Sequence, residues 1–272
     1  CKHACVNLES DFAERILDAA KNSENLITFG FNKKAKVYGY DVRKDGDKLA
    51  FNVKTPKFDK EFALTMPGLF NIENALGAIG AAYALNIPYE FMYSGLLKAR
   101  SGGRMEKYES QDGEKIVIVD YAHNKLSFTK LYESTKEEYK GRNIVTVFGC
   151  PGGKAFTRRE NLGTLAGQHS DEIILTEEDP GEEPVIDICK DIAKHVKVHN
   201  DNCKIIEDRE EAIKDSIFLS KPHSIILLTG KGRETRQKIG KEYVPCPSDV
   251  DFVLQYLKEY DEREKEAAIT KM

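Results

Sequence analysis

The chain has 272 residues, of which 41 are Lys or Arg and 45 are Asp or Glu, so its formal net charge is −4. This near balance excludes an overall electrostatic attraction to nucleic acid or to an anionic membrane. Hydrophobic residues make up 40% and charged residues 32% of the chain, which is typical of a globular protein with a charged surface. The length favours two domains.

The cysteines and the apolar runs bear on the compartment. No apolar run reaches the ~18 residues that a transmembrane helix needs, and no signal peptide is visible. The six cysteines are scattered and form no CxxC pair, which favours a reduced setting over a disulfide framework or a zinc site. We therefore expect a cytoplasmic protein with no nucleic-acid partner, no membrane contact and no metal bound by these residues. The chain begins with Cys1 rather than Met, and we expect that it was cut from something longer.

The first 66 residues are predicted to form mainly strands, at residues 4–8, 26–29, 35–40, 49–53 and 62–66. Turns such as Lys44-Asp45-Gly46-Asp47 separate them. Helices are expected over residues 11–22 with Ser10 as the N-cap, over 72–85 with Asn71 as the N-cap, and from Pro88 to about residue 99. Ser101-Gly102-Gly103 then breaks the pattern and predicts a domain boundary.

The second part of the chain alternates strand and helix. Strands are expected at residues 116–119, 144–148, 172–175, 204–206 and 225–228, and helices at about 126–139, 158–169, 185–196, 209–219 and 249–260. This order predicts an α/β fold with a mostly parallel sheet covered by helices on both faces. Ligands bind such sheets at the carboxyl ends of the strands, so the segments that follow the strands are the candidate site.

Asp120-Tyr121-Ala122-His123 follows the first of these strands. A carboxylate there can accept hydrogen bonds from ribose hydroxyls, and Tyr and His rings offer flat faces to a base. A strand-end Asp that caps the next helix is the alternative.

Gly149-Cys150-Pro151-Gly152-Gly153-Lys154 follows the second strand and resembles a phosphate-binding turn. It is not a Walker A loop, because Ala155 follows the lysine. Arg158 and Arg159 would add positive charge for a phosphate or a carboxylate.

Two further loops are charged. Residues 176–183 hold five acids, which form either a solvated loop before a helix or an acceptor for a substrate ammonium. Thr229-Gly230-Lys231-Gly232-Arg233-Glu234 combines both signs of charge, which suits a zwitterion such as an amino acid.

In the first half, Asn74 lies one helical turn after Asn71, on the same side of a helix rich in Ala and Gly. Arg104, just past the boundary, is a candidate for contact with an anion, although an interdomain ion pair is the commoner role for such an arginine.

Taken in order, the Asn71–Asn74 segment, Gly103-Arg104-Met105-Glu106, Asp120–His123 and the three later loops resemble the Mur ligases, especially those that add the third amino acid of the peptidoglycan precursor. The resemblance implies a remnant of the central ATPase domain at residues 1–102, a Rossmann-like C-terminal domain at 103–266 and a tail at 267–272. The P-loop, the magnesium ligands and a carbamylated lysine would lie upstream of this chain.

The resemblance also implies a reaction and roles for residues. ATP, with Mg²⁺, would convert the carboxylate of UDP-MurNAc-dipeptide to an acyl phosphate, which the amino group of the incoming amino acid attacks. Asn71 and Asn74 would contact the adenine, Asp120 would hold the ribose with His123 nearby, and Arg104 would act as the catalytic contact to the phosphates. The amino acid would be bound by Lys154, Arg158, Glu178, Asp179, Lys231 and Glu234. We expect a monomer, and we expect this chain to be inactive alone.

Two segments depart from the family pattern. Members that add diaminopimelate carry Asp-Asn-Pro-Arg, whose Arg grips the extra carboxylate, whereas this chain has Glu178-Asp179-Pro180-Gly181. The resemblance therefore implies L-lysine or another diamino acid. The family's glycine turn usually continues Asp-Arg-Asp, whereas here Lys154 replaces the arginine that clasps the amino acid's carboxylate and lacks its bidentate fork. The alternatives are a folylpolyglutamate synthase type of ligase and a non-catalytic homologue that binds a nucleotide or a partner protein.

Overall fold

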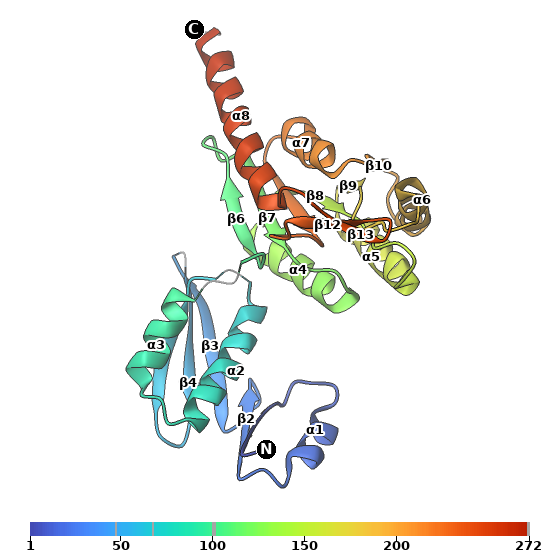
Figure 1. The fold of residues 1–272 in the computed structure, drawn as a ribbon. Coiled ribbons are helices and arrows are strands. Elements are labelled where there is room, and N and C mark those ends of the chain that lie inside the picture. Colours follow the sequence, from blue (N-terminus) through green and yellow to red (C-terminus); the bar gives the residue numbers. More distant parts are fainter. Residues whose placement is uncertain (47, 67, 100–101, 271–272) are drawn as a thin grey trace. The chain divides into compact units, whose positions relative to one another are not determined.

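The computed structural model describes residues 1–46, 48–66, 68–99 and 102–270 (Figure 1). The chain folds into two compact units, Cys1–Ser101 and Gly102–Met272. Asp47 of the predicted turn and Ser101 of the predicted boundary lie outside the described residues.

The N-terminal unit is a five-stranded sheet with helices packed against it (Figure 1). Its strands lie in the order β1 (His3–Asn7), β2 (Asn25–Gly30), β3 (Val37–Asp45), β4 (Lys48–Lys54) and β5 (Asp59–Leu64). The first three run parallel and the last two are antiparallel to their neighbours. The helices are α1 (Ala13–Ala20), α2 (Phe70–Ala84) and α3 (Tyr89–Lys98). Apolar residues of α2 and of the strands form one core, including Ile27, Phe51, Phe62, Leu76 and Ile79.

The two predicted N-caps of this unit are wrong. Helix α1 begins two residues later than expected, because a turn from the carbonyl of Ser10 to the N–H of Ala13 precedes it. Helix α2 begins at Phe70, and its N-cap position is occupied by Leu69, which makes no side-chain cap. Asn71 therefore lies inside the first turn of α2, where its N–H donates to the carbonyl of Gly68.

The C-terminal unit contains a six-stranded sheet in the order β10-β9-β8-β11-β7-β6. The strands are β6 (Glu106–Glu109), β7 (Lys115–Asp120), β8 (Asn143–Phe148), β9 (Glu172–Leu175), β10 (Cys203–Ile205) and β11 (Ser224–Thr229). All are parallel except β6, which runs antiparallel to β7 at the edge. The helices are α4 (Lys125–Glu138), α5 (Phe156–His169), α6 (Val185–Val196), α7 (Arg209–Leu219) and α8 (Asp249–Thr270).

Helices cover both faces of this sheet (Figure 1). On one face, Val145 and Ile226 pack in a core with Ile213 of α7 and Val253 of α8. Side chains alternate between faces along a strand, so Phe148 points to the other face, where its ring lies 5.4 Å from the ring of Phe128 in α4. The predicted α/β fold with a mostly parallel, doubly covered sheet is confirmed.

The sequence prediction omitted three elements. They are the edge strand β6 and the antiparallel hairpin of β12 (Arg236–Ile239) and β13 (Glu242–Pro245). In addition, α8 continues to Thr270, about ten residues beyond the predicted end at 260 and into the predicted tail. In the described part of the chain, no helix has the length and apolar character needed to cross a membrane.

Candidate functional site

Four parallel strands of the C-terminal unit deliver the predicted site segments to one edge of the sheet. The register pairs Thr229 at the end of β11 with Asp120 at the end of β7, and Phe148 at the end of β8 with Leu175 at the end of β9. The loops that follow these strands therefore start side by side, as the parallel order requires.

Lys231 is the centre of a hydrogen-bonded network at this edge. Its Nζ lies 2.9 Å from Asp179 Oδ1, 2.9 Å from Glu234 Oε2 and 2.7 Å from the carbonyl oxygen of Arg236. Burial opposes the charge of Lys231, but the hydrogen bonds to Glu234 and Asp179 outweigh it, and the pKa of the lysine is raised. All three ammonium hydrogens have protein acceptors, so Lys231 orders the two carboxylates.

Glu178 is a buried acid of the site. Its carboxylate packs beneath Gly230, where a Cβ would lie 2.5 Å from Glu178 Oε2. Arg158 Nη1 lies 3.7 Å from Glu178 Oε1, which is an ion pair without close hydrogen-bond geometry. Burial raises the pKa of Glu178 to about 7. This carboxyl group therefore exchanges its proton near neutral pH.

Asp179 differs from Glu178 although the two are neighbours in sequence. Its Oδ1 accepts hydrogen bonds from Lys231 Nζ and from the N–H of Lys238 at 3.0 Å. Burial tends to raise the pKa of Asp179, but the Lys231 and Lys238 hydrogen bonds and the charge of the exposed Lys154 lower it. Asp179 is thus an ionised group that joins the acidic loop to the 229–234 loop and to β12.

Arg104 connects to the same network. Its guanidinium lies 5.4 Å from the centre of the Tyr121 ring, and the hydroxyl of Tyr121 donates to Glu234 Oε1 at 2.9 Å. Glu234 in turn accepts from Lys231. A continuous path of contacts therefore runs from the predicted phosphate contact to the predicted amino-acid contacts, within one unit.

Asp120 and His123 hold the turn after β7. The Asp120 oxygens accept the N–H groups of Met105 and Ala122 at 2.8 and 2.7 Å, and burial raises the pKa of Asp120 against those bonds. His123 Nδ1 lies 2.8 Å from the carbonyl oxygen of Tyr121, which can only accept, so Nδ1 carries a hydrogen. The structure thus shows Asp120 stabilising the turn, whereas contact with a ribose stays a prediction.

Asn71 and Asn74 belong to the N-terminal unit. Asn71 is buried, and Asn74 Nδ2 donates to Asn71 Oδ1 at 3.2 Å from one turn further along α2. The pair therefore lies on one face of the helix, as the spacing predicts. Their role toward adenine stays a prediction.

Arg158 and Arg159 point in different directions. Arg158 faces Glu178, whereas the buried Arg159 donates two hydrogen bonds to Glu183, at 2.8 and 2.7 Å, and contacts Asp191 at 3.4 Å. Glu183 also accepts the N–H of Gly153. The expectation that Arg159 gathers charge for a ligand is therefore wrong, because its guanidinium is committed to an internal ion pair that supports the glycine turn.

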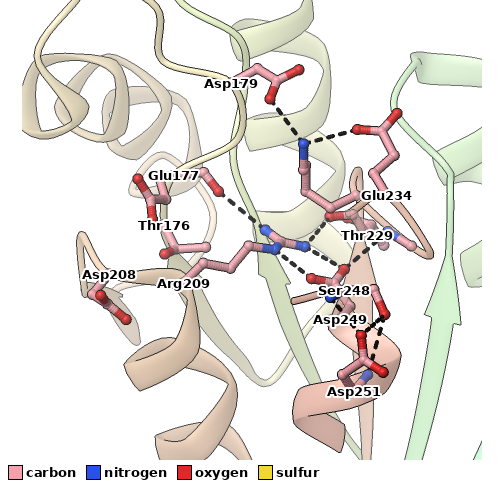
Figure 2. Close-up of polar contacts among 12 residues, drawn as sticks. Thr176, Glu177, Asp179, Asp208, Arg209, Thr229, Glu234, Ser248, Asp249 and Asp251 are labelled. Atoms are coloured by element: carbon pink, nitrogen blue, oxygen red, sulfur yellow. Dashed lines mark hydrogen bonds and ion pairs between the residues drawn. The ribbon is translucent and has the colours of Figure 1, made fainter. Parts of the chain in front are cut away.

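The sequence analysis missed the buried ion pair between Arg209 and Asp249 (Figure 2). Arg209 is the first residue of α7 and Asp249 the first of α8. Forty positions separate them, so no local spacing links them. The available signal was a charged residue at the start of each of two successive predicted helices, at 209 and 249. Within the described residues, three or more His, Cys, Asp or Glu side chains nowhere gather as a metal site.

Comparison with known families decides the identity of the chain. Residues 1–82 match the family model of the Mur ligase middle domain, and residues 103–232 match that of the Mur ligase glutamate ligase domain. The chain belongs to the Mur ligase family.

Two relatives from different bacteria align with most of this chain. The chain is 32% identical over 238 residues to UDP-N-acetylmuramoyl-L-alanyl-D-glutamate–2,6-diaminopimelate ligase of Clostridioides difficile strain 630, covering 87% of this chain and 49% of that protein. It is 34% identical over 250 residues to UDP-N-acetylmuramyl-tripeptide synthetase of Roseiflexus sp. strain RS-1, covering 90% and 48%. The chain thus spans about half the length of these Mur ligases.

A solved structure supports the fold. A UDP-N-acetylmuramoyl-L-alanyl-D-glutamate–2,6-diaminopimelate ligase has a TM-score of 0.61 and 24% identity to the chain, covering 95% of this chain and 53% of that one. This likeness shows the Mur ligase fold. Members of the family are ATP-dependent ligases, and the relatives of this chain are named as ligases.

Proposed function

We propose that this chain is the middle and C-terminal part of an ATP-dependent ligase that adds the third amino acid, L-lysine or another diamino acid, to UDP-MurNAc-L-Ala-D-Glu through an acyl phosphate. The observation that carries the proposal is the path of contacts from Arg104 through Tyr121 and Glu234 to Lys231 and Asp179. The path joins the exposed Arg104, whose charge suits a phosphate, with the carboxylates of Glu234 and Asp179, which suit an amine. Amide formation through an acyl phosphate needs both groups close together.

Of the residues predicted to contact ATP, Arg104 fits that role better than Asp120. The exposed guanidinium of Arg104 suits the charge of a phosphate. Asp120 is less accessible, because its oxygens already accept main-chain N–H groups. ATP would supply the phosphoryl group that activates the dipeptide carboxylate, with Mg²⁺ held by residues outside this chain. Arg104 would then stabilise negative charge that develops on that group.

The acidic loop supports an ammonium-bearing amino acid. Glu178 offers a buried carboxylate, and an ammonium group is the natural partner for such a group. Gly181 occupies the place of the arginine that grips the second carboxylate of diaminopimelate. Its φ is +62°, and its N–H and carbonyl group are bonded to Lys238 and Gly240 of the hairpin. An arginine could occupy this left-handed position only with strain. A second carboxylate would therefore lack its usual partner.

The test is phosphate release by the natural full-length form of the protein, with ATP, magnesium and UDP-MurNAc-dipeptide, against a panel of amino acids that includes lysine, ornithine and diaminopimelate. Release with lysine or ornithine alone supports the whole proposal. Release with diaminopimelate keeps the ligase and refutes the specificity. Release only with a folate and glutamate, or no release from a folded protein that binds ATP, refutes the proposed reaction.

A further inference from the structure

Arg209 joins three elements at the site edge of the C-terminal sheet (Figure 2). Its Nε and Nη2 donate to the two oxygens of Asp249 at 2.7 and 2.8 Å, which is a bidentate ion pair. Nη2 also donates to the carbonyl of Thr229 at 2.9 Å, and Nη1 donates to the carbonyl of Glu177 at 3.2 Å. One buried guanidinium thus holds the loop after β9, the end of β11 and the start of α8.

Asp249 continues this arrangement into the 229–234 loop. Its Oδ2 accepts the N–H of Gly232 at 3.1 Å as well as the hydrogen bond from Arg209. The ion pair therefore grips the main chain on either side of Lys231, at Thr229 through Arg209 and at Gly232 through Asp249.

The side chain between these two anchor points is that of Lys231, which holds Asp179 and Glu234. Moving the main chain of the loop would move the ammonium away from both carboxylates. Removing Arg209 and Asp249 from water costs free energy that their attraction offsets only in part, so a gain in stability is a weak explanation for the pair.

We propose that Arg209 and Asp249 are positioning residues that fix the 229–234 loop, and through Lys231 the carboxylates that receive the incoming amino acid. The proposal rests on the proposed ligase function. In this proposal Arg209 and Asp249 act through the loop, not through contact with the amino acid or ATP. The fork geometry is essential, because a lysine in place of Arg209 cannot bind both oxygens of Asp249 and the carbonyl of Thr229.

The kinetic test compares Arg209→Lys and Asp249→Asn with the parent in the full-length ligase. We expect KM for the amino acid to rise by about tenfold or more, with KM for ATP changed less than about twofold, because only the amino-acid side is displaced. The matched control is Lys115→Met, which removes another buried cation at the opposite end of the same sheet, where Lys115 Nζ bonds Ser220 and Lys221. If KM for ATP and KM for the amino acid rise by the same factor in Arg209→Lys and Asp249→Asn, the proposal is overturned. It is also overturned if Lys115→Met raises KM for the amino acid alone.

A second test does not depend on activity. Amide hydrogen exchange of this chain should show Gly232 protected in the parent and exchanging about tenfold faster or more in Asp249→Ala, with β8 unchanged. Equal exchange in parent and variant overturns the anchoring of the loop. Faster exchange at Gly232 in Asp249→Ala together with an unchanged KM for the amino acid overturns the positioning role. A parent protein without ligase activity refutes the proposed function, whereas the exchange of Gly232 still decides whether the ion pair holds the loop.

Discussion

Lys231 and Lys154 are two lysines of the candidate site that differ in burial. The side chain of Lys231 is 3% exposed and bonded to two carboxylates, whereas Lys154 is exposed. Replacing Lys231 with Met should lower the free energy of unfolding by about 2 kcal/mol, because Asp179 and Glu234 lose their shared cation but are partly exposed to water. Lys154→Met should change it by less than about 0.5 kcal/mol. Urea denaturation of both variants measures the difference, and equal effects would contradict the network.

Glu178 gives a prediction about pH. Because its pKa is about 7 in the folded protein against an ordinary value of 4.5, stability from its neutral form is full below pH 4.5 and is lost as the pH rises to about 7. Glu178→Gln lacks this dependence. From pH 5 to pH 8 the free energy of unfolding of the variant, relative to the parent, should therefore rise by about 2 kcal/mol.

The control for that comparison is Glu182→Gln, which alters an exposed acid of the same loop. A pH-dependent rise of the same size in this variant would contradict the assignment of the effect to Glu178. A Glu178→Gln difference that stays constant from pH 5 to pH 8 would mean that Glu178 ionises without penalty in the folded protein.

At the scale of elements, the central strands and helices followed from the sequence because their signals are local. Continuous apolar runs marked β7, β8, β9 and β11, since strands of a parallel sheet are buried on both faces. The hairpin of β12 and β13 is polar, and it depends on contacts from distant segments, such as the bonds of Gly181 to Lys238 and Gly240. Residues 261–269 of α8 have high helix propensity and none of them is fully buried, so apolar periodicity could not show where the helix ends.

The candidate site divides in the same way. The order of the motifs predicted that Lys231, Glu178, Asp179 and Glu234 lie at one edge of the sheet. In the structure Lys231 bonds Asp179 and Glu234, and Glu178 packs against Gly230. The difference in pKa between Glu178 and Asp179 could not be predicted, because it depends on which of two adjacent carboxylates reaches Lys231. The same holds for Arg209 and Asp249, which meet only in the folded sheet.

The same substitution should have opposite effects in a turn and in a helix. Gly181 has φ of +62°, so Gly181→Ala should destabilise the protein by about 1 kcal/mol. Gly95 lies on the exposed side of α3, where a Cβ meets nothing within 4 Å, so Gly95→Ala should stabilise by about 0.5–1 kcal/mol. Thermal denaturation compares the two, and a loss of stability at Gly95 would show that α3 packs differently.

At the scale of the whole molecule, each unit has its own apolar core. The cluster around Ile226, Ile213 and Val253 belongs to the C-terminal unit, and the cluster around Phe51, Phe62 and Leu76 to the N-terminal unit. We therefore expect residues 102–272 to fold when produced alone and to show amide NMR signals that overlay those of the same residues in the longer chain. Broad, collapsed signals would contradict the independence of this core.

Helix α8 offers a position for a probe of how the two units are arranged. Its last core residue is Tyr260, and the helix then continues to Thr270, a further 15 Å or so at about 1.5 Å per residue. Ile269 near its tip is 73% exposed. A spectroscopic probe there would lie at the opposite end of α8 from Asp249, so its distance to a second probe on α3 would measure any relative movement of the two units as each proposed substrate is added.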